Sequence, residues 1–193
     1  YRLIWTGQYE HLVRAEERLK LVVPVTLALI LLLLYLNFRS LAKALIVLLS
    51  VPFAAIGAIW YLDYLGYNLS VAVWVGIIAL AGVAAETGVV MLVYLDEAYE
   101  RRVREGRMAT VHDLREAIME GAVQRVRPKM MTVAAIMGGL LPIMWTTGTG
   151  ADVMKRIAAP MIGGMVSSTI LTLLVIPVLY ALWRGGWSRP DIR

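Results

Sequence analysis

A single carboxylate stands inside a long apolar stretch of this sequence. Glu86 is the only charged residue between positions 69 and 95, and nine residues separate it from the charged segment that follows. On a helix that rises 1.5 Å per residue, it would lie roughly 14 Å from that edge. Carboxylates at such depth in a membrane commonly mark proton or ion pathways, so Glu86 is the first candidate for proton exchange. The alternative is a protonated glutamate that only bonds a neighbouring helix.

Three further residues could complete a proton relay with this glutamate. Lys129 stands at the start of another apolar stretch, where it could pair with Glu86 or anchor the helix end at the membrane surface. Arg125 suits an inner-surface anchor and is also a candidate member of the relay. Thr132 could supply a hydroxyl group to the relay, although threonine in a membrane helix usually bonds its own backbone.

Methionine supplies the candidate metal ligand, because the chain has ten methionines, two histidines and no cysteine. The lack of cysteine excludes disulfides, thiolate catalysis and cysteine-based metal centres. Thioethers bind Cu(I) and Ag(I), whereas carboxylates and imidazoles suit harder divalent ions. Most of the methionines are expected to pack against helices or lipid. Met154 is expected in an outer-side loop among charged neighbours, so it is the metal candidate.

The sequence carries no motif of an enzyme or of a resident cofactor. It has no phosphate-binding loop, no nucleophile triad and no helix with metal-ligand spacing. Ser50, Ser167 and Ser168 lie in apolar stretches that offer no histidine or aspartate partner, which argues against an intramembrane hydrolase. We therefore expect a protein without enzymatic activity and without a cofactor.

Five apolar stretches must position these candidate residues. Hydrophobic residues make up 60% of the chain, and each stretch approaches or exceeds the roughly 20 residues that a membrane-spanning helix needs. Aromatic residues gather at the ends of the stretches, as they do at membrane interfaces. The sequence thus predicts an all-α, polytopic transmembrane helix bundle in the lipid bilayer, with spans at 21–38, 44–62, 69–95, 130–147 and 157–183.

The distribution of basic residues predicts the orientation of the five spans. The side that holds the turn after the first span, residues 96–129 and the C-terminus carries 13 lysines and arginines, against 6 on the other side. Cytoplasmic loops carry the excess of positive charge, so the N-terminus is expected outside and the C-terminus in the cytoplasm. The net charge of +5 is then a topology signal, and no nucleic-acid partner is expected.

The segments outside the spans suggest a piece of a longer protein. Residues 1–8 resemble the end of a strand, and a polar helix follows to residue 20 and leads into the first span. Residues 96–129 are expected to form an inner connector and residues 184–193 an inner tail. Within the connector, Thr110 begins a capping-box pattern. The helix that it starts is expected to lie on the inner membrane surface through the apolar stripe Val111, Leu114, Ile118 and Ala122.

Three segments of the chain resemble a known family of exporters. They are the run AGVAAETGVVMLVYL around Glu86, the run AVQRVRPKMMTVAAI around Lys129, and the run MKRIAAPMIGGM that begins at Met154. These runs resemble the last helices of resistance-nodulation-division exporters, and more narrowly the heavy-metal efflux branch. The Arg-x-Arg-Pro and Met-Thr pattern is shared across the superfamily. The combination of Glu86 with Lys129 is more specific, and it favours the monovalent ions Cu(I) and Ag(I).

The resemblance implies a larger assembly and a role for each candidate residue. It implies a proton-driven pump of the bacterial inner membrane, with twelve spans in two halves, of which this chain would supply five of the second six. Residues 1–20 would end a periplasmic domain. The pump would be a homotrimer joined to a periplasmic adaptor and an outer-membrane channel. Glu86 and Lys129 would belong to its proton relay, and Met154 to a methionine route for the transported copper or silver ion.

Other functions of the same sequence stay open at this point. Export of divalent metals or drugs would use the same scaffold. A non-transporting membrane domain of related architecture would have no use for a pair formed by Glu86 and Lys129. The pair is therefore the feature that separates these alternatives.

Overall fold

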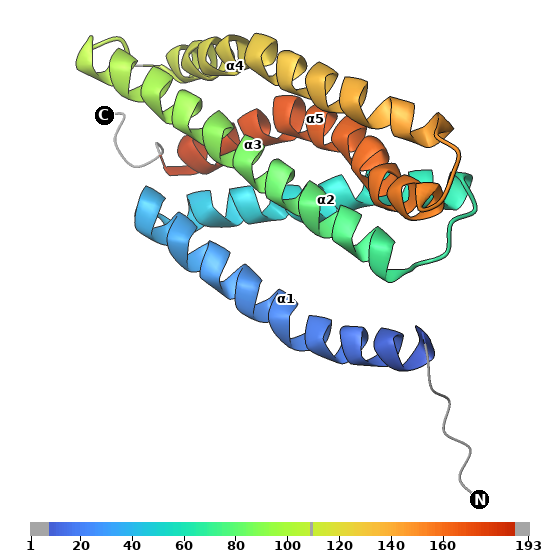
Figure 1. Cartoon of the computed structure of the whole chain (residues 1–193). Coiled ribbons are helices and arrows are strands. Elements are labelled where there is room, and N and C mark those ends of the chain that lie inside the picture. Colours follow the sequence, from blue (N-terminus) through green and yellow to red (C-terminus); the bar gives the residue numbers. More distant parts are fainter. Residues whose placement is uncertain (1–7, 109, 188–193) are drawn as a thin grey trace, which may run out of the picture. The chain divides into compact units, whose positions relative to one another are not determined.

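The computed structural model describes residues 8–108 and 110–187, and these residues form helices without any β-strand. Five long α-helices and one short 3₁₀-helix follow one another along the chain (Figure 1). Each α-helix is long and apolar enough to cross a membrane. The predicted all-α class with five spans is confirmed. The elements are α1 (Gln8–Phe38), α2 (Leu41–Tyr64), α3 (Val71–Arg104), α4 (Val111–Leu140), η1 (Leu141–Trp145) and α5 (Ala151–Trp187).

The chain divides into two compact units, residues 1–44 and 45–193. The helix α1 makes up most of the first unit. It runs from Gln8 to Phe38 with a proline inside it, so the polar lead-in segment and the first span are one helix. Gln8 starts this helix instead of ending a strand, and residues 1–7 lie outside the described part of the chain. The candidate relay residues and Met154 all belong to the second unit.

The second unit is a helix bundle built around α3. This helix packs against both α4 and α5, and α4 also contacts α5 (Figure 1). Two serines connect α2 to the bundle: Ser50 lies 3.3 Å from the carbonyl oxygen of Ala84 on α3, and Ser167 on α5 donates to a carbonyl on α2. Small residues let membrane helices approach closely. One buried cluster accordingly mixes small and large side chains from α2, α3 and α5: Ala54, Ala58, Leu80, Ala84 and Met165.

Two glycines face each other where α2 meets α5. A Cβ atom added to Gly163 would collide with the carbonyl oxygen of Gly57 and with the side chain of Tyr61. A Cβ atom added to Gly57 would collide with Ser167. Because a backbone carbonyl cannot move aside as a flexible side chain can, only glycine fits this contact. The pair therefore sets the close approach of the two helices.

The Gly163→Ala variant is expected to be less heat-stable than the wild type. Overpacking of a tight core contact costs roughly 1–3 kcal/mol, which corresponds to a shift of several degrees in the midpoint of thermal unfolding. The matched control is Gly138→Ala on α4, where a Cβ would meet nothing within 4 Å. That variant should be neutral or slightly stabilising, because alanine favours a helix more than glycine does. Thermal unfolding of both variants in detergent is the measurement, and equal midpoints would contradict the contact.

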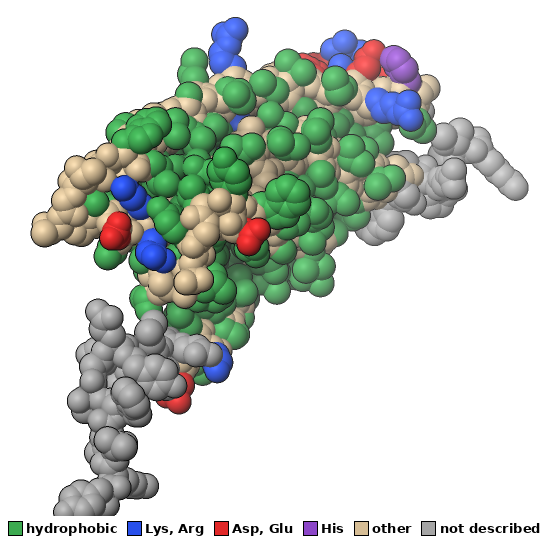
Figure 2. Space-filling view, turned by 90° about the vertical axis from the view of Figure 1, so that its right-hand side faces the viewer, with side chains coloured by type: hydrophobic (Ala, Val, Ile, Leu, Met, Phe, Trp, Pro, Cys, Tyr) green, Lys and Arg blue, Asp and Glu red, His purple; other side chains and the backbone are tan. Residues whose placement is uncertain are grey.

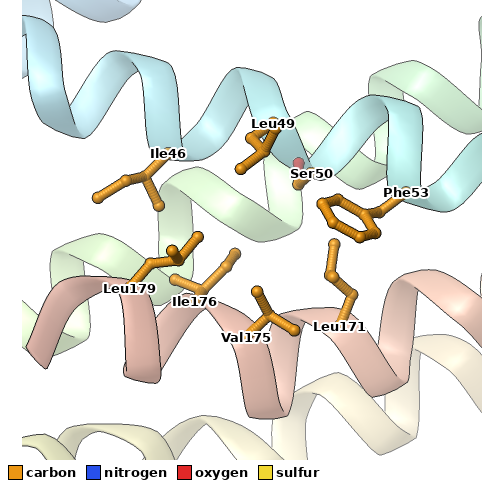
Figure 3. Close-up of a pocket in the computed structure, with 8 residues that line it drawn as sticks. All are labelled: Ile46, Leu49, Ser50, Phe53, Leu171, Val175, Ile176 and Leu179. Atoms are coloured by element: carbon orange, nitrogen blue, oxygen red, sulfur yellow. The ribbon is translucent and has the colours of Figure 1, made fainter. Parts of the chain in front are cut away.

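A shallow apolar groove lies between α2 and α5 (Figure 3). Its one polar side chain is Ser50, whose hydroxyl donates to the carbonyl of Val47 at 2.6 Å. The groove therefore offers no charged or metal-binding group. Most of the surface drawn in Figure 2 is apolar as well, as suits helices that face lipid. The groove is lined by Ile46, Leu49, Ser50, Phe53, Leu171, Val175, Ile176 and Leu179.

The predicted inner connector, residues 96–129, is not a separate element. Its first part continues α3 as far as Arg104, and from Val111 onward its second part belongs to α4. Only a short turn lies between the two helices. Gly106 in this turn has a φ of 67°, which favours glycine. The predicted capping box at Thr110 is confirmed, and it starts α4.

The middle of the apolar stripe of this connector is buried in the bundle instead of lying on the membrane surface, whereas Val111 at its start is 63% exposed. Leu114 and Ile118 are buried, and a Cβ atom on Gly121 would lie only 2.9 Å from the carbonyl oxygen of Tyr94 on α3. Helical spacing predicts an apolar stripe, but it does not distinguish a membrane surface from a neighbouring helix. Here, charges on α3 favour packing of α4 against α3 over the membrane surface. The ion pairs between the two helices are Arg101–Glu120, Arg102–Glu116 and Arg102–Glu120.

The boundaries of the last two spans also differ from the predicted ones. The fourth span was predicted to begin at residue 130, but α4 begins at Val111 and Pro128 lies inside it. That helix ends at Leu140, short of residue 147, and η1 follows. Pro142 has no backbone N–H and crowds the preceding turn, so the regular α-helix stops there. The helix α5 begins at Ala151, six residues before the predicted start. Residues 188–193 of the predicted tail lie outside the described residues.

Candidate proton-relay site

Lys129 is buried in the helix bundle. Its side chain on α4 is 1% exposed, and it is the one charged residue in the buried class among the residues whose exposure the structure describes. A buried ammonium group is costly unless acceptors and opposite charges compensate it. A lysine that only anchored a helix end would extend its ammonium toward water or lipid head groups. The anchor interpretation of Lys129 therefore does not fit its position.

The hydrogen-bond partner of Lys129 is a threonine on the neighbouring helix. Nζ of Lys129 donates to Oγ1 of Thr87 on α3, with 3.0 Å between the two atoms. Thr87 is itself 5% exposed, and its hydroxyl donates to the carbonyl oxygen of Val83 at 2.7 Å. The hydroxyl hydrogen is thus used within α3, and the hydroxyl oxygen accepts from the ammonium. This contact links α3 and α4 across 42 residues of sequence.

Glu86 stands next to this contact but does not take part in it. Its side chain is exposed in the described chain, whereas Thr87, the next residue, is buried. The expected direct pairing of Glu86 with Lys129 is therefore not present, because Lys129 bonds Thr87 instead. Consecutive residues of a helix point about 100° apart, which is why only one of the two faces α4. The carboxylate still attracts the ammonium of Lys129 through space.

Arg125 lies one helical turn before Lys129 and is partly buried. Its guanidinium carbon is 5.8 Å from the ring centroid of Tyr94 on α3, in the range of a cation–π contact. Its Nε atom is buried and has no hydrogen-bond partner among the described residues. The guanidinium also repels the ammonium of Lys129. Arg125 therefore adds positive charge to this site, while Arg127 is exposed as an anchor would be.

Thr132 does not join the contact around Lys129. Its hydroxyl donates to the carbonyl oxygen of Pro128 at 3.1 Å, within α4, and the residue is exposed in the described chain. This is the backbone bond that threonine usually makes in a membrane helix. The structure thus brings Lys129, Thr87 and Arg125 together and leaves Thr132 exposed and bonded to its own helix.

Met154 lies in the first turn of α5 and not in a loop as predicted. Its backbone N–H donates to the carbonyl of Gly150, and its side chain is 50% exposed. The sequence expectation failed because α5 begins at Ala151, before the apolar stretch that marked the span. Among the described residues, no group of three histidine, cysteine, aspartate or glutamate side chains is placed to hold a metal ion.

Sequence reasoning missed Thr87, although a signal for it was present. A hydroxyl directly after the only charged residue of an apolar span is a second polar group at the same depth. Such a group needs a partner, and helical spacing places it on a different face from Glu86. Which of the two faces meets α4 depends on the rotation of α3 in the bundle, and the sequence alone does not provide that rotation.

A second polar contact that the sequence did not reveal joins α3 to α5. The hydroxyl of Tyr180, which is fully buried, donates to Oδ1 of Asp96 at 2.6 Å. The guanidinium carbon of Arg184 lies 4.3 Å from the ring centroid of Tyr99, and its Nη2 is 3.9 Å from the same Asp96 oxygen. These contacts fasten α5 to α3 at the end of the apolar region. They lie ten residues beyond Glu86 along α3.

Long apolar helices around a buried, hydrogen-bonded lysine define a class of protein: polytopic membrane proteins that keep ionisable groups inside the helix bundle. The chain belongs to the AcrB/AcrD/AcrF family, whose model matches residues 1–184. This is a family of resistance-nodulation-division transport proteins, and the resemblance predicted from the sequence is confirmed.

Individual relatives within the family are metal efflux proteins. The chain is 55% identical over 180 residues to the cation efflux system protein CusA of Escherichia coli O157:H7, covering 92% of this chain and 17% of CusA. It is 42% identical over 182 residues to the cobalt-zinc-cadmium resistance protein CzcA of Cupriavidus metallidurans, covering 94% of this chain and 16% of CzcA. A crystal structure of a heavy metal efflux pump matches with a TM-score of 0.80 and 34% identity, over 95% of this chain and 17% of that one. The chain thus spans about a sixth of the length of these relatives.

Proposed function

We propose that this chain is the C-terminal membrane part of a proton-driven efflux pump that exports Cu(I) and Ag(I). The observation that carries the proposal is the buried ammonium of Lys129, held by Thr87 beside Glu86 between two spanning helices. A structural anchor does not need a charge in this position, and a proton-coupled transporter does. Membership of a transporter family supports the same conclusion.

In the proposed mechanism, Glu86 is the group that takes up and releases the proton. A carboxyl group can exist with or without its proton, and its charged form attracts the nearby ammonium of Lys129. Arg125 adds a second positive charge one turn away. Thr132 contributes a hydroxyl on the outer face of α4, where a relay group from another part of the pump could reach it. Protonation would then change the attraction between α3 and α4, which moves the helices.

The transported ion is proposed to be monovalent copper or silver, with Met154 as a ligand. A thioether needs no deprotonation before it binds a soft ion, and it competes poorly for Zn(II). The chain is more similar to CusA, at 55% identity, than to CzcA, at 42%. The similarity to a cobalt-zinc-cadmium resistance protein makes export of divalent cations the second candidate function. Multidrug export and a non-transporting membrane domain rank below both.

The proposed assembly is a homotrimer in the bacterial inner membrane, joined to a periplasmic adaptor and an outer-membrane channel. The excess of lysine and arginine in residues 96–129 favours the cytoplasm for that end of α3 and α4. The N-terminus of the chain would then lie in the periplasm and the C-terminus in the cytoplasm. The lipid bilayer would surround the spans.

The test of this function is ion uptake by the complete pump in liposomes under an imposed proton gradient. The wild type is expected to transport silver and not zinc. The Met154→Ile variant, which keeps an apolar side chain of similar volume but lacks sulfur, should transport silver at least several-fold more slowly, because a weak soft-ligand site has been lost. Expression and trimer assembly should not change, because Met154 is half exposed.

Two outcomes of this experiment would contradict the proposal. Transport of zinc in preference to silver would favour the divalent function. Silver transport by Met154→Ile at the wild-type rate would remove Met154 from the metal route, while the relay residues would be unaffected. The matched control is Met119→Ile on α4. Met119 is also exposed, at 62%, and it lies at the other end of the bundle from Met154.

A further inference from the structure

The apolar groove between α2 and α5 runs lengthwise along the two helices (Figure 3). Ile46 lies opposite Leu179 at one end, and Phe53 lies opposite Leu171 at the other. From Leu171 to Leu179 the helix rises by about 12 Å. The groove holds about 160 Å³ of empty space. A second helix, about 10–12 Å across with its side chains, does not fit into that space, whereas a flexible hydrocarbon chain does.

The groove residues of α5 continue toward the end of the helix as a tryptophan. Val175, Leu179 and Trp183 follow one another at intervals of four residues, which places them along one side of α5. The ring of Trp183 meets the ring of Tyr180 edge-on, with 5.9 Å between the two centroids. Tryptophan is enriched where hydrocarbon meets the lipid headgroups. The row of apolar side chains thus ends in a residue typical of a membrane surface.

Arg184 places a positive charge beside this tryptophan. Its guanidinium carbon lies 4.9 Å from the ring centroid of Trp183 and 4.3 Å from that of Tyr99 on α3. Its Nη2 is 3.9 Å from the Asp96 oxygen that also accepts the hydrogen bond of Tyr180. A guanidinium has five N–H donors, so it can serve one carboxylate oxygen and a further acceptor at once. The Arg184 side chain is 24% exposed, which leaves it within reach of a group outside the bundle.

The distance between this charge and the far end of the groove matches the depth of one lipid leaflet. Arg184 follows Leu171 by 13 residues, which corresponds to about 20 Å along α5. Half of a bilayer, with its hydrocarbon and its headgroup region, is about 20–22 Å deep. A phospholipid whose phosphate contacts Arg184 therefore has the length to extend a chain past Leu179 as far as Leu171.

We propose that this face of α2 and α5 binds an anionic phospholipid. One acyl chain lies in the groove, and the phosphate pairs with Arg184 beside Trp183. The lipid is anionic because an arginine near the membrane surface attracts a headgroup with net negative charge, and a headgroup without net charge gains no such attraction. In the proposed orientation of the chain this lipid belongs to the cytoplasmic leaflet. Its binding depends neither on the transported ion nor on Glu86.

The test uses the complete pump in liposomes with phospholipid probes that carry a diazirine near the middle of one acyl chain. One probe has a phosphatidylglycerol headgroup, which is anionic, and the other has a phosphatidylcholine headgroup, which has no net charge. After illumination, mass spectrometry identifies the labelled residues. Label on residues 46–53 of α2 and 171–179 of α5 reports that a chain occupies the groove.

The headgroup contact is tested by substitution of Arg184. In the wild type, the anionic probe should label the groove about fivefold more than the other probe, the factor expected for one arginine at the membrane surface. Arg184→Gln should remove this preference, and Arg184→Lys should keep much of it because the charge remains. The matched control is Arg104→Gln, which removes an exposed positive charge at the end of α3 and should label as the wild type does.

A second pair of variants tests the groove itself. Val175→Phe puts a ring into the groove, so labelling of the groove by either probe should fall several-fold. The matched control is Val178→Phe, which adds the same ring at a residue that is 56% exposed and does not line the groove. That variant should label as the wild type does. Where Arg184→Gln does not accumulate in membranes, the contrast between the two probes in the wild type and in Val175→Phe still decides.

Three results would overturn the proposal. They are equal labelling of the groove by the two probes in the wild type, an unchanged preference in Arg184→Gln, and a groove that neither probe labels. The last result would mean that another part of the pump covers this face. Because the labelling needs neither a metal ion nor a proton gradient, the lipid site stands or falls separately from the proposed export of copper and silver.

Discussion

Replacement of Glu86 by glutamine in the complete pump is expected to abolish resistance to copper and silver. Glutamine has nearly the same shape and cannot bind and release a proton at this position. Without the Glu86 carboxyl group, the rate of transport should fall by at least about a hundredfold. Enzymes that lose a proton-transfer group slow down by a similar factor. The measurements are growth of cells on copper or silver and silver uptake by liposomes that contain the purified variant.

The matched control for this experiment is Glu97→Gln on the same helix. Glu97 is an exposed carboxylate outside the apolar stretch, so the same chemical change is made where no relay is proposed. Membrane insertion of both variants should equal that of the wild type, because removal of a charge from a span does not oppose insertion. Normal resistance in Glu86→Gln would mean that Glu86 only packs, and the relay would have to be sought elsewhere.

Lys129→Met is expected to lose transport while it keeps the stability of the protein. Methionine resembles lysine without its charged end, so the space in the bundle stays filled. Replacement of a buried charged group by an apolar one of similar volume is often neutral or stabilising, by about 1–4 kcal/mol. The carboxylate form of Glu86, however, loses its nearby positive charge, so proton release is impaired. Silver uptake and the midpoint of thermal unfolding are the two measurements.

Two further variants sharpen this prediction. Lys129→Arg keeps the charge but changes its shape, and it should retain part of the activity. Arg127→Met removes an exposed positive charge two residues earlier on α4, and it should transport normally. Loss of transport in Arg127→Met alone, with normal transport in Lys129→Met, would return Lys129 to a passive role. A large drop in the unfolding midpoint of Lys129→Met would instead indicate that the lysine is structural.

The bond between Lys129 and Thr87 changes how the pair of charges is understood. The sequence predicts two groups of opposite charge in one bundle, and the simplest expectation is an ion pair. In the structure the ammonium rests on a neutral hydroxyl, and the carboxylate lies on an adjacent face of α3. A permanent ion pair would hold the glutamate in its charged form. The two charged groups therefore lie near each other without forming the ion pair.

Polar contacts join the end of α3 to the start of α4 and to the end of α5. Arg102 bonds Glu116 at 2.8 Å, and Tyr180 bonds Asp96 at 2.6 Å. Because Lys129 lies on α4 a few turns beyond Glu116, a movement of its helix would have to bend α4 or break these contacts. These contacts thus fasten α4 and α5 to α3 at this end of the bundle.

The sequence by itself determined the membrane class, the five spans and the position of the rare charges. These follow from local properties: a run of apolar residues must leave water, and a helix is the structure that satisfies its backbone in lipid. The family followed from the same local runs around Glu86, Lys129 and Met154, and the family match confirms it. None of these conclusions requires knowledge of how one helix is rotated against another.

Only the tertiary structure decided which side chains meet. The rotation of α3 turns Thr87 toward Lys129 and Glu86 away from it, and the length of α4 places Leu114 and Ile118 against α3 instead of the membrane surface. Consecutive residues of a helix point about 100° apart, so the rotation of α3 decides which of the two meets Lys129. That rotation is set by many contacts far apart in the sequence, such as the close approach of Gly76 on α3 to the carbonyl of Ile157 on α5. Local sequence patterns do not specify these contacts between distant residues.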